Sequence, residues 1–476
     1  MRFLFIHVKR GIFMNILSKV NRKTSLAKFI DRDQNLQRTI DTKDLIMMGI
    51  GAVIGAGIFV IPGTVAATTA GPGIILSFVI ATIVCSLCAM CYAEFSSALP
   101  VAGSAYTFGN VIFGEITGWI IGWGLILEYM LSVATVASSW SAYLQSLLAN
   151  FGLHMPKALS ANYDPNHGTY VNLIAILIVL LISWILTRGV KSSTRLNDIM
   201  VIVKIAIIIV FVVAGAFFVK PTNWNPFMPF GVSGVFKGAS LVFFAYLGFD
   251  VIAASAGEVK NPKKTMPIGI IGTLIICTIL YILVSIILTG IVPYSKLNVS
   301  DPVTFALQMI HLDKLGILIS LGALAGMFTM MVNMVFSSSR LIYSIGRDGL
   351  LPKKLSKIDT KKNVPVHSVI FVTIVIAVMG GIFSLDKLAS LVNIGTLIAF
   401  TFMSIGILYL RKRKDIKNDG FKVPLYPVLP IVSAVACIYL LIQLPLDTWI
   451  LAIIWFAGGL CIYFGYGIKH SQSNKS

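Results

Sequence analysis

The chain contains twelve apolar stretches, each close to the length of about 20 residues that a helix needs to cross a lipid bilayer. Only 12% of its 476 residues are Asp, Glu, Lys or Arg. That share is about half of what soluble globular proteins carry. The sequence therefore excludes an ordinary soluble enzyme, a disordered chain and a nucleic-acid-binding module, and predicts an all-α polytopic membrane protein. The predicted transmembrane helices cover roughly residues 44–68, 73–98, 113–146, 171–187, 197–219, 235–257, 267–291, 314–344, 365–383, 387–410, 426–443 and 446–468.

The basic residues indicate how these stretches are oriented. With the N-terminus in the cytoplasm, 31 of the 38 Lys and Arg residues fall on the inner side, six fall on the outer side, and Lys204 lies within a stretch. Cytoplasmic loops of membrane proteins are enriched in Lys and Arg. We therefore expect a multi-pass protein of the cell membrane with both termini in the cytoplasm. The net charge of +19 follows from this topology and does not indicate nucleic-acid binding.

The N-terminal residues and the cysteines point to no further function. Residues 1–13 lack the order of charge, apolar core and cleavage site of a signal peptide, and a more usual basic tail begins at Met14. We expect residues 1–13 to be a start-site artefact or a dispensable extension. Cys85, Cys88 and Cys91 share one helix face without a histidine or a further cysteine pair nearby, which favours packing over a metal site.

Motifs of several other membrane-protein classes are missing from the sequence. It contains no P-loop, no HExxH or GxSxG motif and no TVGYG potassium filter. We therefore predict no cofactor, no metal and no enzymatic activity.

Helix-breaking residues are concentrated in the first and sixth stretches. The first reads GIGAVIGAGIFVIPG and includes Gly55 and Gly57, and the sixth reads FFAYLGFDVIAASAG and includes Gly248. Interrupted stretches at matching positions in two halves are typical of transporters built from inverted repeats. Close helix packing through small residues such as Gly51 and Gly55 is the alternative explanation. Because glycine has a low helix propensity, the density of glycines favours local unwinding.

Unwound backbone at mid-membrane can bind a zwitterion. Free N–H groups attract a carboxylate and free C=O groups attract an ammonium, and such groups are tolerated only beside a protein-lined cavity. The surrounding residues Val53, Phe244, Leu247 and Met334 are apolar. The first interruption contains no acidic residue that would attract a cationic side chain. The pattern therefore favours a neutral, apolar amino acid as the ligand.

Four residues are candidates for ionisable groups within the membrane, where such groups are costly and usually functional. Lys204 is too deep to reach water easily and must find a carboxylate, backbone carbonyls or water, or lose its proton. It is either a protonation switch or a fixed tether between helices. Glu128 is either its partner or a carboxylate facing a wet cavity. Asp250 follows the second interruption and is a candidate to cap the next half-helix or to bond free amides. Glu94 is expected near the cytoplasmic end of the second span, as an interface or gate residue.

Three motifs give the sequence a specific resemblance. GIGAVIGAGIFV, FFAYLGFD followed by EVKNPKKTMPIGI, and SRLIYSIGRDGLLPKKLSKI resemble the amino acid–polyamine–organocation (APC) superfamily, most closely the bacterial relatives of the cationic amino acid transporters. The resemblance runs from about residue 44 to residue 410. It implies a five-plus-five inverted repeat, with 44–219 as the first repeat and 234–410 as the second. Two further helices (426–468) and cytoplasmic tails at 1–43 and 469–476 complete this arrangement.

The resemblance also implies roles for individual residues. The substrate carboxylate would meet the amides of Ala56 and Gly57, and its amine would meet carbonyls of the second interruption. Many relatives have Ser or Thr at the position of Ala56, so a hydroxyl contact is lost here. Lys204 matches a lysine at the place where sodium-coupled relatives hold sodium, which implies proton coupling, and Glu128 matches an acidic position. The substrate-binding residues implied are Val53, Ile54, Ala56, Gly57, Phe244 as an aromatic gate, Ala245, Leu247 and Met334.

These observations predict a secondary active transporter that imports neutral L-amino acids with protons by alternating access. Amino acid exchange, or transport of cationic amino acids or polyamines, is the alternative within transport. A sensor or channel is disfavoured because no sizeable soluble domain is present. The expected partners are the solute, protons and the lipid bilayer. The sequence leaves open whether a small single-span membrane subunit binds outside the bundle.

Overall fold

The computed structural model describes residues 38–101, 104–188, 194–359, 364–416 and 418–472. Within these residues the chain is helical, and three isolated β-bridges are the only strand-like pairing. The N-terminal tail to residue 37, with Met14 and the expected extension 1–13, lies outside the described residues, as do residues 473–476 of the C-terminal tail.

The first half of the described chain supplies the helices on either side of the first interruption. Its elements are α3 (Thr42–Val53), α4 (Ala56–Phe59), α5 (Ile61–Val65), the π-helical turn η1 (Ala66–Ala70), the 3₁₀ turn η2 (Gly71–Gly73), α6 (Ile74–Ala98), α7 (Ser104–Ile112), α8 (Glu115–Ala149), α9 (Lys157–Ser160), α10 (Leu173–Thr187) and α11 (Thr194–Ala216).

The second half contains the other interruption and ends in the C-terminal helices. Its elements are α12 (Gly231–Val242), the 3₁₀ turn η5 (Phe243–Tyr246), α13 (Phe249–Ala254), α14 (Pro262–Ile291), α15 (Pro302–Met309), α16 (Asp313–Arg347), α17 (Val366–Ile382), α18 (Leu385–Leu410), α19 (Val428–Ile442), α20 (Leu446–Ile462) and α21 (Ile468–His470). Short 3₁₀ turns and a π-helical turn between α20 and α21 (Tyr463–Gly467) complete the described chain.

The helices confirm a polytopic membrane protein. Eight helical segments of the described chain are long and apolar enough to cross a bilayer, and α10, α17 and α19 are shorter apolar helices. Helices suit this environment because they satisfy their backbone hydrogen bonds internally. Each predicted stretch contains helix, while the number of twelve crossings and the five-plus-five repeat stay predictions.

The third predicted stretch, 113–146, differs from the structure at both ends. The chain forms a separate helix, α7, before α8 begins at Glu115, and α8 continues to Ala149. The pair packs closely: a Cβ atom built on Gly109 would lie 3.3 Å from the Cα of Gly118. Sequence reading missed α7 because it has only nine residues and its burial depends on this contact.

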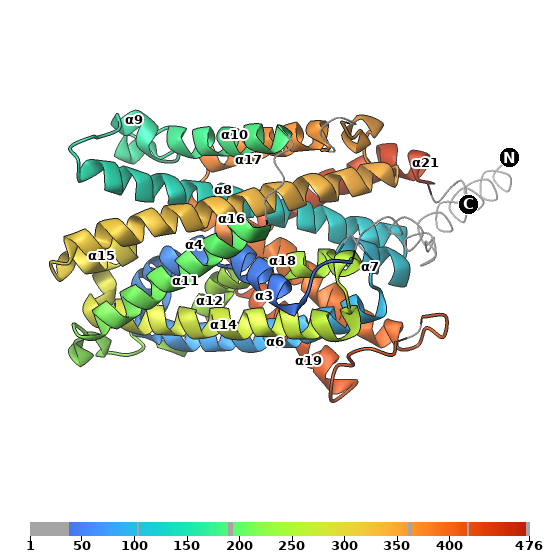
Figure 1. Ribbon diagram of the computed structural model, residues 1–476, viewed down its shortest axis with the longest axis horizontal. Coiled ribbons are helices and arrows are strands. Elements are labelled where there is room, and N and C mark those ends of the chain that lie inside the picture. The colour runs from blue at the N-terminus through green and yellow to red at the C-terminus, as the bar shows by residue number, and fades with distance from the viewer. Residues whose placement is uncertain (1–37, 102–103, 189–193, 360–363, 417, 473–476) are drawn as a thin grey trace, which may run out of the picture.

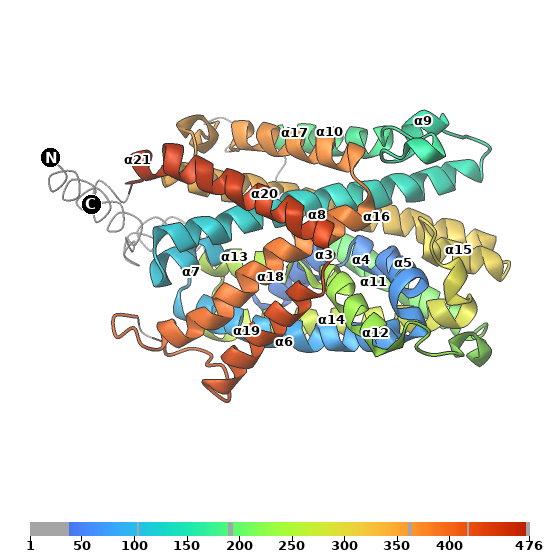
Figure 2. The same ribbon diagram turned by 180° about the vertical axis from the view of Figure 1, so that it is seen from behind.

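Figures 1 and 2 show how the long helices are arranged. The pair α10–α17 lies along one edge of the molecule, and the pair α6–α14 lies toward the opposite edge. Between them α8 packs against α16 and α18, and the short segments α3 and α4 lie in the middle of the bundle. The interrupted helices are therefore enclosed by long, continuous ones.

The backbone conformation shows where each of the two helices is interrupted. The first interruption comprises Ile54 and Gly55: α3 ends at Val53, Ile54 is extended, and α4 forms one turn from Ala56. The second interruption comprises residues 243–248, where η5 is followed by extended Leu247 and by Gly248 with φ +113°. This φ is accessible to glycine and strained for other residues.

The two interrupted helices also touch. A Cβ atom built on Gly57 would lie 2.5 Å from the Cα of Ala245, and one built on Gly248 would lie 2.9 Å from the carbonyl oxygen of Ala52. Because a side chain at either position would push the helices apart, these glycines permit the contact.

Glu94 lies in a buried ion pair. Its carboxylate is fully buried and accepts hydrogen bonds from Arg411 Nε (2.9 Å) and Nη2 (2.8 Å). Asn418 Nδ2 and the Val423 N–H also donate to it, each over 2.7 Å. The residue thus fixes the loop after α18 to the end of α6, as an interface residue in this conformation.

Replacing Gly248 tests the backbone requirement of the second interruption. We expect Gly248→Ala to lower stability by about 1–3 kcal/mol, because a residue with a Cβ is strained at this φ. Thermal unfolding of the purified protein in detergent measures this change. Gly458→Ala is the matched control, since a Cβ there meets nothing within 4 Å. Equal unfolding temperatures for Gly248→Ala and the unmodified protein would contradict the expectation.

Candidate functional site

The backbone of the first interruption offers free hydrogen-bond donors. Among the described residues, no acceptor pairs with the N–H groups of Gly55, Ala56 and Gly57, and the next N–H, that of Ile58, bonds to the Gly55 carbonyl over 3.4 Å. Successive free N–H groups favour a negatively charged partner. These include the two amides predicted to meet a carboxylate.

The carbonyls beside this interruption are occupied by Lys204. From α11, its Nζ donates to the carbonyl oxygens of Gly51 (3.0 Å) and Ile54 (3.1 Å), and the side chain is fully buried. The structure thus places Lys204 against the end of α3. It does not pair Lys204 with Glu128, which was one alternative from the sequence: neither carboxylate oxygen of Glu128 has a hydrogen-bond partner among the described residues.

Tyr281 connects the two interruptions. From α14 its hydroxyl donates to the Ala245 carbonyl over 2.6 Å and lies 3.3 Å from the Val53 carbonyl oxygen. A hydroxyl has one proton to donate, so the shorter contact is the main bond. Sequence patterns do not single out this tyrosine, because it lies on an uninterrupted helix.

The second interruption leaves fewer free acceptors than expected. The Phe244 carbonyl accepts the Leu247 N–H over 3.3 Å, and the Ala245 carbonyl accepts the Tyr281 hydroxyl. Among the described residues, no donor pairs with the carbonyls of Tyr246 and Leu247. Three predicted substrate-binding residues lie on this segment: Phe244, Ala245 and Leu247. Of these, Leu247 therefore keeps its carbonyl open.

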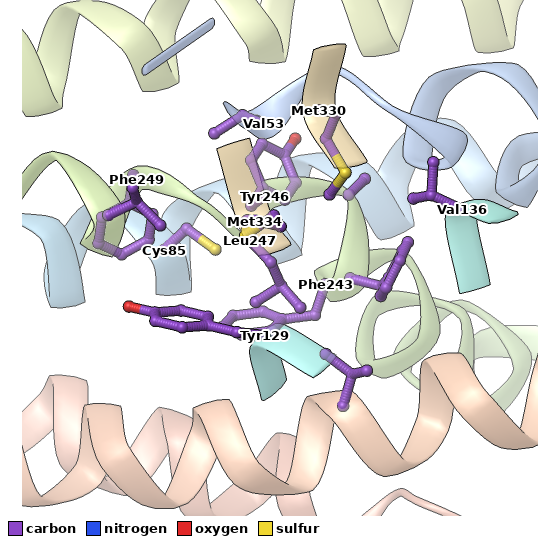
Figure 3. Packing of buried hydrophobic residues seen from close by; sticks show 14 of the residues in the cluster. Val53, Cys85, Tyr129, Val136, Phe243, Tyr246, Leu247, Phe249, Met330 and Met334 are labelled. Carbon is purple, nitrogen blue, oxygen red and sulfur yellow. The ribbon is translucent and has the colours of Figure 1, made fainter. Parts of the chain in front are cut away.

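The surroundings of the interruptions are mainly apolar, as Figure 3 shows. Two wall residues were missed from the sequence. Met330 on α16 and Val136 on α8 lie 3.3 Å and 3.6 Å from a Cβ built on Gly55. Met330 precedes the predicted wall residue Met334 by one helical turn, so helix periodicity was the signal that could have found it.

The predicted substrate-binding residues are enclosed in this conformation. Gly57 is buried, and the other seven are at most 4% exposed: Val53, Ile54, Ala56, Phe244, Ala245, Leu247 and Met334. A solute would therefore reach the free backbone groups only after the surrounding helices separate.

A second group of buried polar side chains follows the second interruption. Tyr129 donates its hydroxyl to Asp250 Oδ2, while Asp250 Oδ1 has no partner among the described residues. Asp250 is also close enough to Glu128 for the two carboxyl groups to interact electrostatically. Asp250 does not cap α13. The N-cap residue of this helix is Gly248, and no side chain makes a capping hydrogen bond there.

Residues 40–465 match the family described as "Amino acid permease". The chain belongs to the amino acid permease family. It is 49% identical to the Methylthioribose transporter of Bacillus subtilis, over 93% of this chain and 96% of that protein. It is 44% identical to the Branched-chain amino acid permease BcaP of the same organism, over 96% and 99%. With Cationic amino acid transporter 3 of Arabidopsis thaliana it shares 35% identity, over 79% and 63%.

Family and fold together make this permease a multi-pass membrane transporter of small molecules and not an enzyme. The expected likeness to cationic amino acid transporters is confirmed, because such proteins are among its relatives.

Removing the Tyr281 hydroxyl tests the link between the interruptions. We expect Tyr281→Phe to destabilise the permease by about 1–3 kcal/mol, since the buried Ala245 carbonyl loses its donor. Thermal unfolding in detergent gives the readout. Tyr294→Phe is the control, because Tyr294 is not buried in the 3₁₀ turn Tyr294–Lys296. If both variants unfold like the unmodified protein, the hydroxyl does not hold the interruptions together.

Proposed function

We propose that this permease imports neutral L-amino acids together with protons, by alternating access across the cell membrane. One observation carries the proposal: free N–H groups at Gly55–Gly57 and a free carbonyl at Leu247 lie on two interrupted helices that touch each other. An α-amino acid carries an anionic and a cationic group on one carbon, so one solute satisfies both sets of backbone groups.

The walls support a neutral and predominantly apolar side chain. Met330 and Val136 approach the first interruption, and Phe244, Leu247 and Met334 are buried around it. In an apolar pocket a charged side chain would lose its hydration without gaining a partner. The relative named Branched-chain amino acid permease supports the same class of substrate.

A methylthioribose-like sugar is the second candidate solute. The relative that carries this name shares 49% identity with the chain over nearly its whole length. Such a sugar lacks a carboxylate and an ammonium, so the free N–H and C=O groups of the interruptions would have no charged group to bind. Uptake measurements therefore distinguish the two candidates directly.

The uptake experiment uses the purified protein in liposomes with an imposed pH gradient, acidic outside. We expect labelled leucine, isoleucine and valine to accumulate, with at least tenfold less uptake of arginine and methylthioribose. Liposomes without protein serve as the control. Accumulation of arginine or methylthioribose without leucine would refute the proposed substrate class, and leucine exchange without a response to the gradient would refute symport.

Proton coupling is proposed to pass through Lys204. Charged, its ammonium binds the carbonyls of Gly51 and Ile54 and holds the end of α3. Hydrogen bonds from a charged donor are about twice as strong as neutral ones. Loss of the proton would therefore loosen α3 and favour separation of the helices around the site. Glu128, which is buried and interacts electrostatically with Asp250, is the proposed second group in coupling.

Replacing the lysine tests this role. We expect Lys204→Met to lose at least nine-tenths of the uptake driven by the pH gradient, because the side chain keeps its length and loses its proton. Lys237→Met, at an exposed position of α12, is the matched control. Leucine-dependent thermal stabilisation of each variant shows whether the fold and site persist. Normal stimulation by the gradient in Lys204→Met would refute the role.

A further inference from the structure

One face of α8 runs past both interruptions. On this face Val136 lies 3.6 Å from a Cβ built on Gly55, and the Tyr143 hydroxyl donates to the Phe59 carbonyl over 2.9 Å. Two turns before Val136, Glu128 is buried and close enough to Asp250 for their charges to interact. Ser132 is four residues from each of them, and residues spaced by four share a helix face. Ser132 therefore faces the same space as the candidate site.

The hydroxyl of Ser132 differs from its neighbours on α8. Thr135 Oγ1 donates to the Leu131 carbonyl over 2.8 Å, and Ser139 Oγ donates to the Thr135 carbonyl over 3.1 Å. Ser132 Oγ is fully buried and has no hydrogen-bond partner among the described residues. Since leaving a buried hydroxyl unpaired is unfavourable, this atom is available to a ligand.

A second unpaired atom lies across from α8 on α18. Asn393 is fully buried, and its Nδ2 donates to the Ser240 carbonyl, 2.8 Å away, just before the second interruption. Its Oδ1 has no partner among the described residues. The two helices are in backbone contact, because a Cβ built on Gly395 would lie 2.8 Å from the Gly124 carbonyl oxygen. Asn393 thus has an open acceptor on α18, a helix that contacts both α8 and the segment just before the second interruption.

We propose that Ser132 and Asn393 form a polar subsite that receives a hydroxyl group of the transported solute. A hydroxyl donates one hydrogen bond and accepts others, so it can donate to Asn393 Oδ1 and pair with Ser132 Oγ. The inference rests on the proposed amino acid transport and specifies its substrate class. It extends that class from aliphatic amino acids to neutral amino acids with a hydroxyl on the side chain.

Valine and threonine provide a matched pair of substrates, because threonine has a hydroxyl where valine has a methyl group. Uptake of each labelled amino acid is measured in liposomes containing the full-length protein, and the threonine-to-valine ratio of uptake efficiencies is compared. We expect the unmodified protein to transport both. Ser132→Ala should lower the ratio about tenfold, the effect of one lost hydrogen bond.

Two further variants keep the test decisive. Asn393→Leu has a similar size and should lower the ratio in the same direction. Thr135→Val is the control, since its hydroxyl is already paired within α8, and it should keep the ratio of the unmodified protein. Valine uptake in each variant shows whether the protein has folded.

The outcomes separate the subsite from the function on which it rests. Transport of valine with exclusion of threonine by the unmodified protein would overturn the subsite and leave amino acid transport intact. An unchanged ratio in both Ser132→Ala and Asn393→Leu would do the same, and would mean that these atoms bind only water. If neither amino acid enters, amino acid transport itself is refuted, and the subsite with it.

Discussion

A polypeptide in a bilayer cannot leave its backbone hydrogen bonds unmade without a compensating partner, and the centre of this protein depends on that constraint. Each helix interruption frees backbone groups, and side chains from continuous helices pair with some of them. Lys204 takes the carbonyls of Gly51 and Ile54, and Tyr281 takes that of Ala245. Interruption and support are thus parts of one arrangement, in which long helices hold the short ones.

The continuous helices form hydrogen bonds with only some of the backbone groups that the interruptions free. Lys204 satisfies two carbonyls near the first interruption, whose N–H groups at Gly55–Gly57 stay open, whereas the second interruption keeps the carbonyls of Tyr246 and Leu247 open. The enclosed space thereby has free N–H groups that favour negative charge at the first interruption, next to the Lys204 ammonium, and free carbonyls that favour positive charge at the second. This polarity favours zwitterions over inorganic ions, and it leaves recognition of the side chain to α8, α16 and α18.

The sequence predicted the features that depend on local chemistry. Glycine density located both interruptions, apolar length located the helices, and the isolated charge drew attention to Lys204. What it could not predict depends on which faces of distant helices meet: the backbone partners of Lys204, the approach of Met330 to Gly55, the pairing of Tyr129 with Asp250, and the unpaired Ser132. The sequence of an apolar span does not indicate which helices pack against it, because nearly all of its side chains could contact either lipid or protein.

The close approach of Gly57 to Ala245 has a mechanical consequence. Because no methyl group fits between the two backbones at this point, no ligand fits between the interrupted helices here unless they separate. A ligand that enters between them must separate the two helices, and its binding free energy contributes to that separation. Ligand binding between these helices and their separation are then coupled, and this structure keeps the two interrupted helices in contact.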